Sequence, residues 1–151
     1  MQKVYFHSED RIFRFEQKNK LKDFINNLFQ LEKTQLRRLD YIFCSDEYLL
    51  QLNRSALNHD YYTDILTFPL HEEKQPVEAE IYISLDRVRE NASLHREKFK
   101  TELLRVIFHG ALHLCGFDDH LENDIREMRT KENQYISLFQ ENVSRETKPR
   151  S

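Results

Sequence analysis

Residues 99–116 read FKTELLRVIFHGALHLCG, and this stretch decides how the chain folds. Its apolar residues cover nearly every side of a helix, so the pattern predicts a helix over residues 99–115 that is buried at the centre of the domain. Two histidines, His109 and His113, lie inside this helix. A buried imidazole needs a hydrogen-bond partner or a metal ion, so the pair indicates a functional site.

The same stretch contains the two glycines of the whole chain, Gly110 and Gly116. Glycine allows a close approach of backbones and a left-handed residue at a helix end. We therefore expect Gly116 to end the helix, reverse the chain and bring residues 117–120 back toward the histidines.

The histidine spacing predicts a metal site. His109 and His113 are four residues apart, so on a helix their side chains project from one face and can share one zinc ion. Asp118, Asp119 and His120 are the candidates for a third ligand. Three protein ligands leave one tetrahedral position open to water, whose pKa zinc lowers to about 7.

Two other interpretations of the histidine pair were weighed. The spacing can be accidental, but the apolar flanks, the two glycines and the Asp-Asp-His cluster favour a metal. The pair also differs from the HExxH motif of metalloproteases, which places a glutamate after the first histidine as general base. Gly110 stands at that position, which speaks against peptidase chemistry.

Outside this stretch, the hydrophobic periodicity predicts alternating strands and helices. The expected fold is a single α+β domain, with a small mixed β-sheet packed by helices and a central metal-bearing helix. The expected strands are 3–6, 39–44, 65–68 and 79–85, and the expected helices are 19–33, 45–52, 86–94, 99–115 and 121–142.

The length and charge of the chain limit its class. With 151 residues, 23 Lys+Arg and 26 Asp+Glu, the chain suits one domain, and its net charge of −3 is not typical of nucleic-acid-binding proteins. We expect this domain over residues 1–143 and a frayed tail over 144–151. Acidic residues near the N-terminus and short apolar runs favour a cytoplasmic protein with no membrane partner.

Residues 109–118, HGALHLCGFD, resemble the signature of the YbeY endoribonucleases and rRNA maturation factors, H-G-x-L-H-L-x-G-Y-D-H. Upstream, residues 52–54 and 63–68, LNR and TDILTF, are similar to further parts of the family pattern, and the resemblance covers about residues 1–142. It implies zinc-dependent cleavage of single-stranded RNA in rRNA 3′-end maturation and ribosome quality control. It also implies RNA and the ribosomal small subunit, or its assembly factors, as partners.

The chain departs from the family pattern at the third ligand. The family has a histidine ten residues after the first, whereas an ungapped count from His109 reaches Asp119, and His120 is one residue further on. The spacing to Glu127 and Met128 also favours the ungapped count. The expected zinc ligands, for about one ion per chain, are therefore His109, His113 and Asp119.

A second departure concerns the arginine that is thought to contact the scissile phosphate in the family. It aligns with Leu57, and the family's following lysine aligns with His59. The candidates for catalytic charge stabilisation are then His59, Arg54 and Arg105, the last one turn before His109 on the helix. For each of the three, a solvent-exposed role is the alternative.

Two alternatives to the endoribonuclease remain open at this point. One is a metallohydrolase of peptide or amide bonds, and the other is a non-catalytic ribosome-assembly factor with structural zinc. Metal occupancy alone discriminates poorly between these functions, whereas cleavage of RNA distinguishes them.

Overall fold

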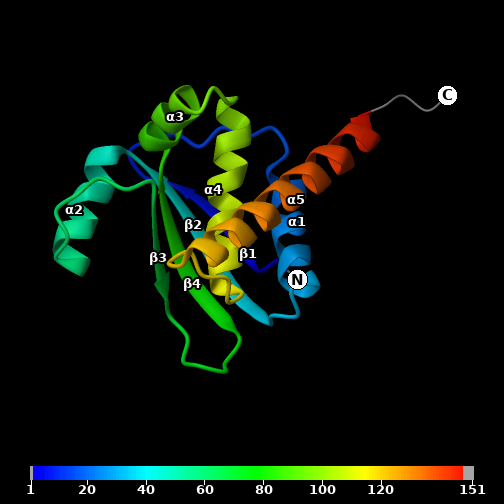
Figure 1. Ribbon diagram of the computed structural model, residues 1–151, viewed down its shortest axis with the longest axis horizontal. Coiled ribbons are helices and arrows are strands. Elements are labelled where there is room, and N and C mark those ends of the chain that lie inside the picture. The colour runs from blue at the N-terminus through cyan, green and yellow to red at the C-terminus, as the bar shows by residue number, and fades with distance from the viewer. Residues whose placement is uncertain (1, 148–151) are drawn as a thin grey trace.

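Four strands form one mixed sheet in the computed structural model, which describes residues 2–147 (Figure 1). The strands are β1 (Val4–Ser8), β2 (Leu36–Cys44), β3 (Ile65–Pro69) and β4 (Val77–Ser84), in the spatial order β1-β2-β4-β3. β1, β2 and β4 are parallel. β3 runs antiparallel to β4 and forms the edge of the sheet opposite β1. The predicted α+β domain with a small mixed sheet is confirmed.

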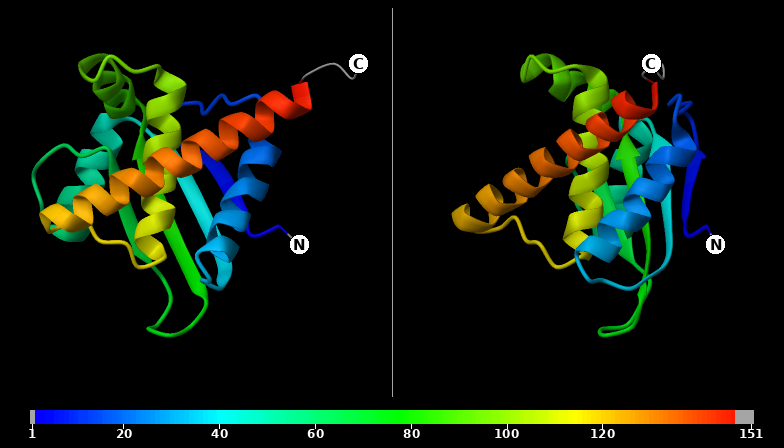
Figure 2. Two further views of the ribbon diagram at one scale, coloured as in Figure 1. Left: turned by 45° about the vertical axis from the view of Figure 1, so that its right-hand side comes forward. Right: turned by 90° about the vertical axis from the view of Figure 1, so that its right-hand side faces the viewer.

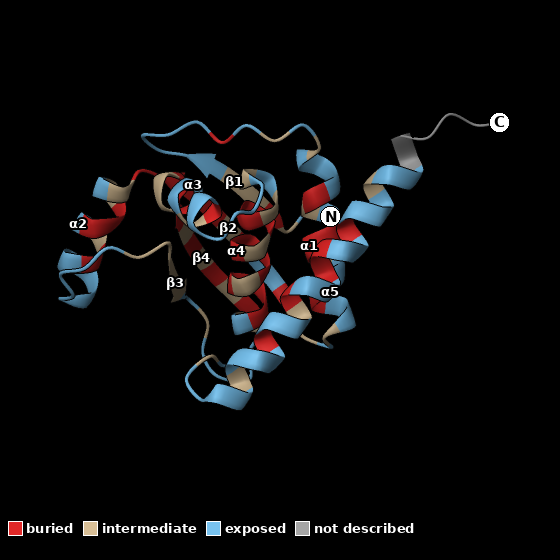
Figure 3. Ribbon diagram, turned by 45° about the horizontal axis from the view of Figure 1, so that its top comes forward, coloured by how far each residue is buried: buried red, intermediate tan, exposed pale blue. Residues whose placement is uncertain are grey.

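Five helices are described. They are α1 (Lys18–Leu31), α2 (Asp46–Leu57), α3 (Leu85–Leu94), α4 (Phe99–Leu114) and α5 (Glu122–Thr147). α1 to α4 pack against this sheet, and α5 packs on α4 and α1. α4 lies against one face of the sheet, and α5 crosses over α4 in both views of Figure 2. Figure 3 shows the consequence, because α4 is buried along much of its length whereas the outer side of α5 is exposed.

α4 is the central helix that the apolar pattern predicts. Phe108 is fully buried and packs against the ring of Phe24, and the Tyr41 hydroxyl donates a hydrogen bond to the carbonyl of Ile107 at 2.8 Å. A Cβ at Gly110 would lie 2.9 Å from Cδ1 of Ile81. The glycine therefore allows α4 to approach the sheet closely, as the sequence predicts.

Gly116 ends α4 in the left-handed conformation that the sequence predicts, with φ of 101°. The N–H of Gly116 donates to the carbonyl of His113, and the N–H of Phe117 donates to the carbonyl of Leu112, each at 3.1 Å. This pair of bonds is a Schellman motif, which satisfies the last carbonyls of the helix and reverses the chain. Residues 117–120 are turned back by this motif.

We expect Gly116→Ala to lower the free energy of unfolding by about 1–2 kcal/mol, the cost of a left-handed residue with a Cβ. Nothing lies within 4 Å of the added Cβ, so the loss comes from backbone conformation and not from a clash. Urea unfolding measures it, and Gly116→Asn should lose less because asparagine tolerates this conformation. An alanine variant as stable as the wild type would contradict the left-handed conformation assigned to Gly116.

The C-terminal boundary differs from the expectation. The sequence predicts a helix end near Asn142 and a frayed tail over 144–151, whereas α5 continues to Thr147. Val143 packs against the core, which extends the helix past the predicted end. Residues 148–151 lie outside the described residues.

Both cysteines are free thiols. Cys44 is buried and Cys115 is half-buried. Burial raises the pKa of Cys44 to about 12 and that of Cys115 to about 11, so both are protonated at neutral pH.

Among the described helices, none has a stretch long and apolar enough to cross a lipid bilayer.

Candidate active site

A polar hollow of about 430 Å³ opens beside α4, where the start of β3, α3 and α5 meet it. α4 places Arg105 and His109 in its lining, one turn apart. The other lining side chains are mostly polar or charged; they are Thr63, Asp64, Ile65, Asn91, His95, Glu102, Val106, Asp119, Arg129 and Glu132.

His109 is held between two carboxylates. Its Nδ1 donates to Oε2 of the buried Glu132 at 2.8 Å, and its Nε2 lies 3.3 Å from Oδ2 of Asp119. Burial alone would lower the pKa of His109, but the hydrogen bond to Glu132 and the charges of Asp119 and Asp64 outweigh it, so the pKa is raised. The His109 ring is therefore fixed with Nε2 toward Asp119.

His113 lies one turn further along α4, outside the lining of the hollow, with an exposed side chain. Its Nδ1 donates to the carbonyl of Phe117 at 3.2 Å. In both histidines Nδ1 is therefore occupied and Nε2 is left for another ligand. Metal-binding histidines are usually held in this way, with one ring nitrogen bound to a carboxylate or a carbonyl.

The returning segment, residues 117–120, brings further candidate ligands to this end of α4. Asp119 faces His109, whereas Nε2 of the largely exposed His120 lies 3.2 Å from Oδ1 of Asp118. Ligand atoms of Asp118, Asp119 and His120 lie within 4.8 Å of one another. Imidazole nitrogens and carboxylate oxygens are zinc ligands, so these residue types suit this ion. Neither His109 nor His113 belongs to this group of three, and the choice of Asp119 over His120 stays a prediction.

Of the three predicted catalytic residues, the structure places Arg105 in the hollow. Its guanidinium donates to Oδ1 of Asn133 at 2.8 Å and to Oε1 of Glu132 at 3.3 Å. Glu132 thus accepts hydrogen bonds from both Arg105 and His109, which joins the two α4 side chains through one carboxylate. Arg105 is held in this network and is not a freely solvated side chain.

The other two predicted residues, Arg54 and His59, lie outside the lining of the hollow. Arg54 donates to Asp60, and the His59 ring stacks on the ring of Tyr61 with centroids 5.3 Å apart. Leu57 lies at the end of α2 and is exposed. The structure therefore does not place Arg54, Leu57 or His59 in the lining beside His109.

The sequence did not predict two residues that line the hollow, Glu132 and Asp64. Glu132 shares the buried face of α5 with Met128, Tyr135 and Phe139, and a glutamate inside such an apolar stripe is a signal that the sequence offered. Burial raises the pKa of Asp64, although the charge of His109 opposes the shift. A carboxyl of this kind in a hollow is a candidate for proton transfer.

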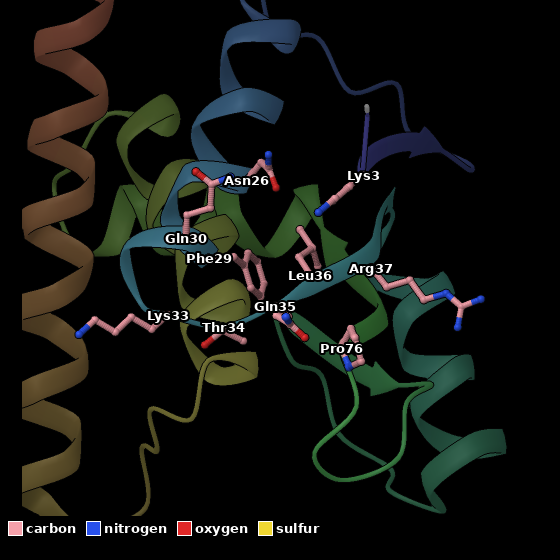
Figure 4. A pocket seen from close by; sticks show the side chains of 10 residues that line it. All are labelled: Lys3, Asn26, Phe29, Gln30, Lys33, Thr34, Gln35, Leu36, Arg37 and Pro76. Atoms are coloured by element: carbon pink, nitrogen blue, oxygen red, sulfur yellow. The ribbon is translucent and has the colours of Figure 1, made fainter.

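A larger hollow of about 660 Å³ lies elsewhere, between the end of α1 and the start of β2 (Figure 4). Lys3, Lys33 and Arg37 contribute to its lining, which contains neither histidine nor carboxylate. It therefore offers no imidazole or carboxylate to hold a metal ion, and we place the chemistry at the smaller hollow.

The fold and the site define an α+β domain in which a largely buried helix presents His109 to two carboxylates beside a polar hollow. The Endoribonuclease YbeY family model matches residues 3–140. The chain is 45% identical to an Endoribonuclease YbeY of Cytophaga hutchinsonii over 135 residues, which cover 89% of this chain and 94% of that protein. It is 41% identical to that of Amoebophilus asiaticus over 133 residues, covering 88% and 90%.

A solved structure agrees with these sequence comparisons. The solution structure of TM1509 from Thermotoga maritima superposes with a TM-score of 0.63 at 28% identity, covering 95% of this chain and 93% of that one. The chain belongs to the Endoribonuclease YbeY family, which confirms the resemblance of residues 109–118. It is therefore a hydrolase with RNA as its substrate.

Proposed function

We propose that the chain is a zinc-dependent endoribonuclease that cleaves single-stranded RNA. Its role would be rRNA 3′-end maturation and ribosome quality control in the cytoplasm, with the ribosomal small subunit or its assembly factors as partners. The observation that carries the proposal is the setting of His109, whose Nδ1 is bound by Glu132 while Nε2 faces Asp119 beside an open hollow.

His109, His113 and Asp119 would hold one zinc ion in this proposal, with His120 as the alternative third ligand. When bound, zinc supplies a Lewis acid that acidifies water and polarises a phosphoryl oxygen. Glu132 orients the His109 ring and fixes its tautomer, because a carboxylate accepts only from a protonated nitrogen.

The rest of the hollow suits a phosphodiester. Arg105 and Arg129 place cationic side chains in its lining, and these attract phosphate. Asp64, with its raised pKa, can hold a proton in the same hollow. The catalytic charge stabilisation predicted for Arg54 and His59, which lie outside the lining of the hollow, remains a prediction.

A substrate panel tests the proposed function. The zinc-loaded protein is incubated with a single-stranded RNA, with a duplex of the same sequence and with a peptide, and the products are separated by size. We expect internal cleavage of the single strand alone, and loss of that cleavage with a chelator. Cleavage of the peptide would establish the amide hydrolase, and zinc binding without any cleavage would establish the assembly factor.

We expect Glu132→Gln to weaken zinc binding by about 10- to 100-fold, the usual effect of removing a carboxylate partner of a ligating histidine. Competition with a chromophoric chelator measures the affinity. Glu127→Gln is the matched control, because Glu127 lies on the same helix and is exposed. A folded Glu132→Gln protein with wild-type zinc affinity would show that Glu132 does not support the ligand.

A further inference from the structure

We propose that Tyr61 and Tyr62, here called the tyrosine pair, form a platform on which bases of single-stranded RNA stack before the strand enters the His109 hollow. This inference rests on the proposed function and extends it to substrate positioning. Base recognition of single strands commonly uses aromatic side chains, because every base has a face that stacks on a ring.

The exposure of the two rings is the first observation. Tyr61 is 55% exposed and Tyr62 is 51% exposed, and they are neighbours in the segment between α2 and β3. Leu57, which is also exposed, ends α2 a few residues before them. Exposed aromatic rings of this kind supply faces on which a base can stack.

The Tyr61 ring is held in place without being covered. It stacks on the His59 imidazole with an interplanar angle of 22°, and its hydroxyl lies 3.1 Å from Nδ1 of that residue. The buried Asn53 donates its amide to the Tyr61 carbonyl at 3.0 Å, which anchors the backbone. A pre-positioned ring loses little conformational entropy when a base stacks on it.

The Tyr62 ring is held from one side by a cation. The guanidinium of Arg87 lies 5.2 Å from the ring centroid. It forms an ion pair with Asp46, with 2.7 Å between Nη2 of Arg87 and Oδ2 of Asp46. This arrangement leaves the other side of the ring for a base. It also adds a cation–π contact of the kind that single-strand-binding proteins combine with stacking.

The tyrosine pair is continuous with the hollow. Thr63 and Asp64, the next two residues of the chain, line it. Because consecutive Cα atoms are 3.80 Å apart, the Cα of Tyr62 lies within about 8 Å of that of Asp64. A strand stacked on the pair would therefore lie close to the part of the hollow that Thr63 and Asp64 line.

Charge favours stacking over phosphate attraction at this surface. The chain carries a net charge of −3, and the nearby Arg54 and Arg87 are each paired with an aspartate. Paired cations release few counterions when they meet a phosphate, so the share of the binding that the tyrosine pair contributes should depend only weakly on salt. This expectation distinguishes a stacking platform from a basic patch.

The test uses a single-stranded RNA that carries 2-aminopurine, mixed with the zinc-loaded protein and read by stopped-flow before cleavage. Quenching of its fluorescence reports stacking, and anisotropy reports binding. We expect Tyr61→Ala and Tyr62→Ala each to weaken binding by at least about fivefold and to reduce quenching. Tyr61→Phe and Tyr62→Phe should retain both, and the fold loss caused by each alanine substitution should change little with salt.

Tyr5→Ala is the matched control, because Tyr5 lies on β1, the opposite edge of the sheet, with Arg38 over its ring at 4.3 Å. Melting temperatures verify folding. Alanine variants that bind and quench like the wild type, while the wild type cleaves RNA, would overturn the platform and leave the proposed function intact. Tyrosine-dependent quenching without cleavage would support the platform and refute the function, and a wild type that binds no RNA would overturn both.

Discussion

Alanine at His109 or His113 is expected to weaken zinc binding by more than about a hundredfold, the upper range for loss of a residue that merely supports a ligand. In each histidine Nδ1 is already engaged, with Glu132 or with the Phe117 carbonyl, and Nε2 is left for the metal. Removing either ring takes away one nitrogen ligand and leaves too few to retain the ion. Elemental analysis of the purified variants measures the loss.

The control for this loss is His71→Ala. His71 lies in the loop between β3 and β4, is hydrogen-bonded to the backbone of Glu78 on β4, and is not part of the lining of the hollow. That variant should keep the zinc content of the wild type. If His109→Ala and His113→Ala also keep it, the metal lies elsewhere and the mechanism proposed here fails with it.

Asp119→Ala should lose zinc to a similar extent, whereas His120→Ala should keep it. The reason is position, because Oδ2 of Asp119 lies 3.3 Å from Nε2 of His109 while the imidazole of His120 is largely exposed and lies beside Asp118. Zinc titration of the two variants in parallel gives the comparison. The reverse result, with zinc lost only from His120→Ala, would assign the third ligand to His120 and refute the ungapped count.

The helix at the centre of the fold could be predicted because its signals are local. An apolar run, two histidines four residues apart and the glycines at 110 and 116 all lie within one short stretch. The structure gives each glycine the expected role, a close approach to Ile81 and a left-handed helix end. Local backbone chemistry of this kind can be inferred from sequence.

The rest of the site depends on contacts between residues far apart in the chain. Glu132 meets His109 across 23 positions, because α5 crosses over α4, and Asp64 reaches the same hollow from the residue before β3. The hydrophobic periodicity of the sequence indicates neither contact. Arg105 was predicted from helix spacing alone, whereas the aspartate partner of Arg54 and the stack of His59 on Tyr61 appear only in the folded chain.

The most direct test of the central claim is RNA cleavage by the wild type and by His113→Ala, assayed side by side on one single-stranded RNA with the zinc content of both preparations known. We expect internal cleavage by the zinc-loaded wild type and none above background by the folded, zinc-depleted variant. Equal cleavage by the two proteins would contradict a zinc-dependent endoribonuclease built on this histidine pair.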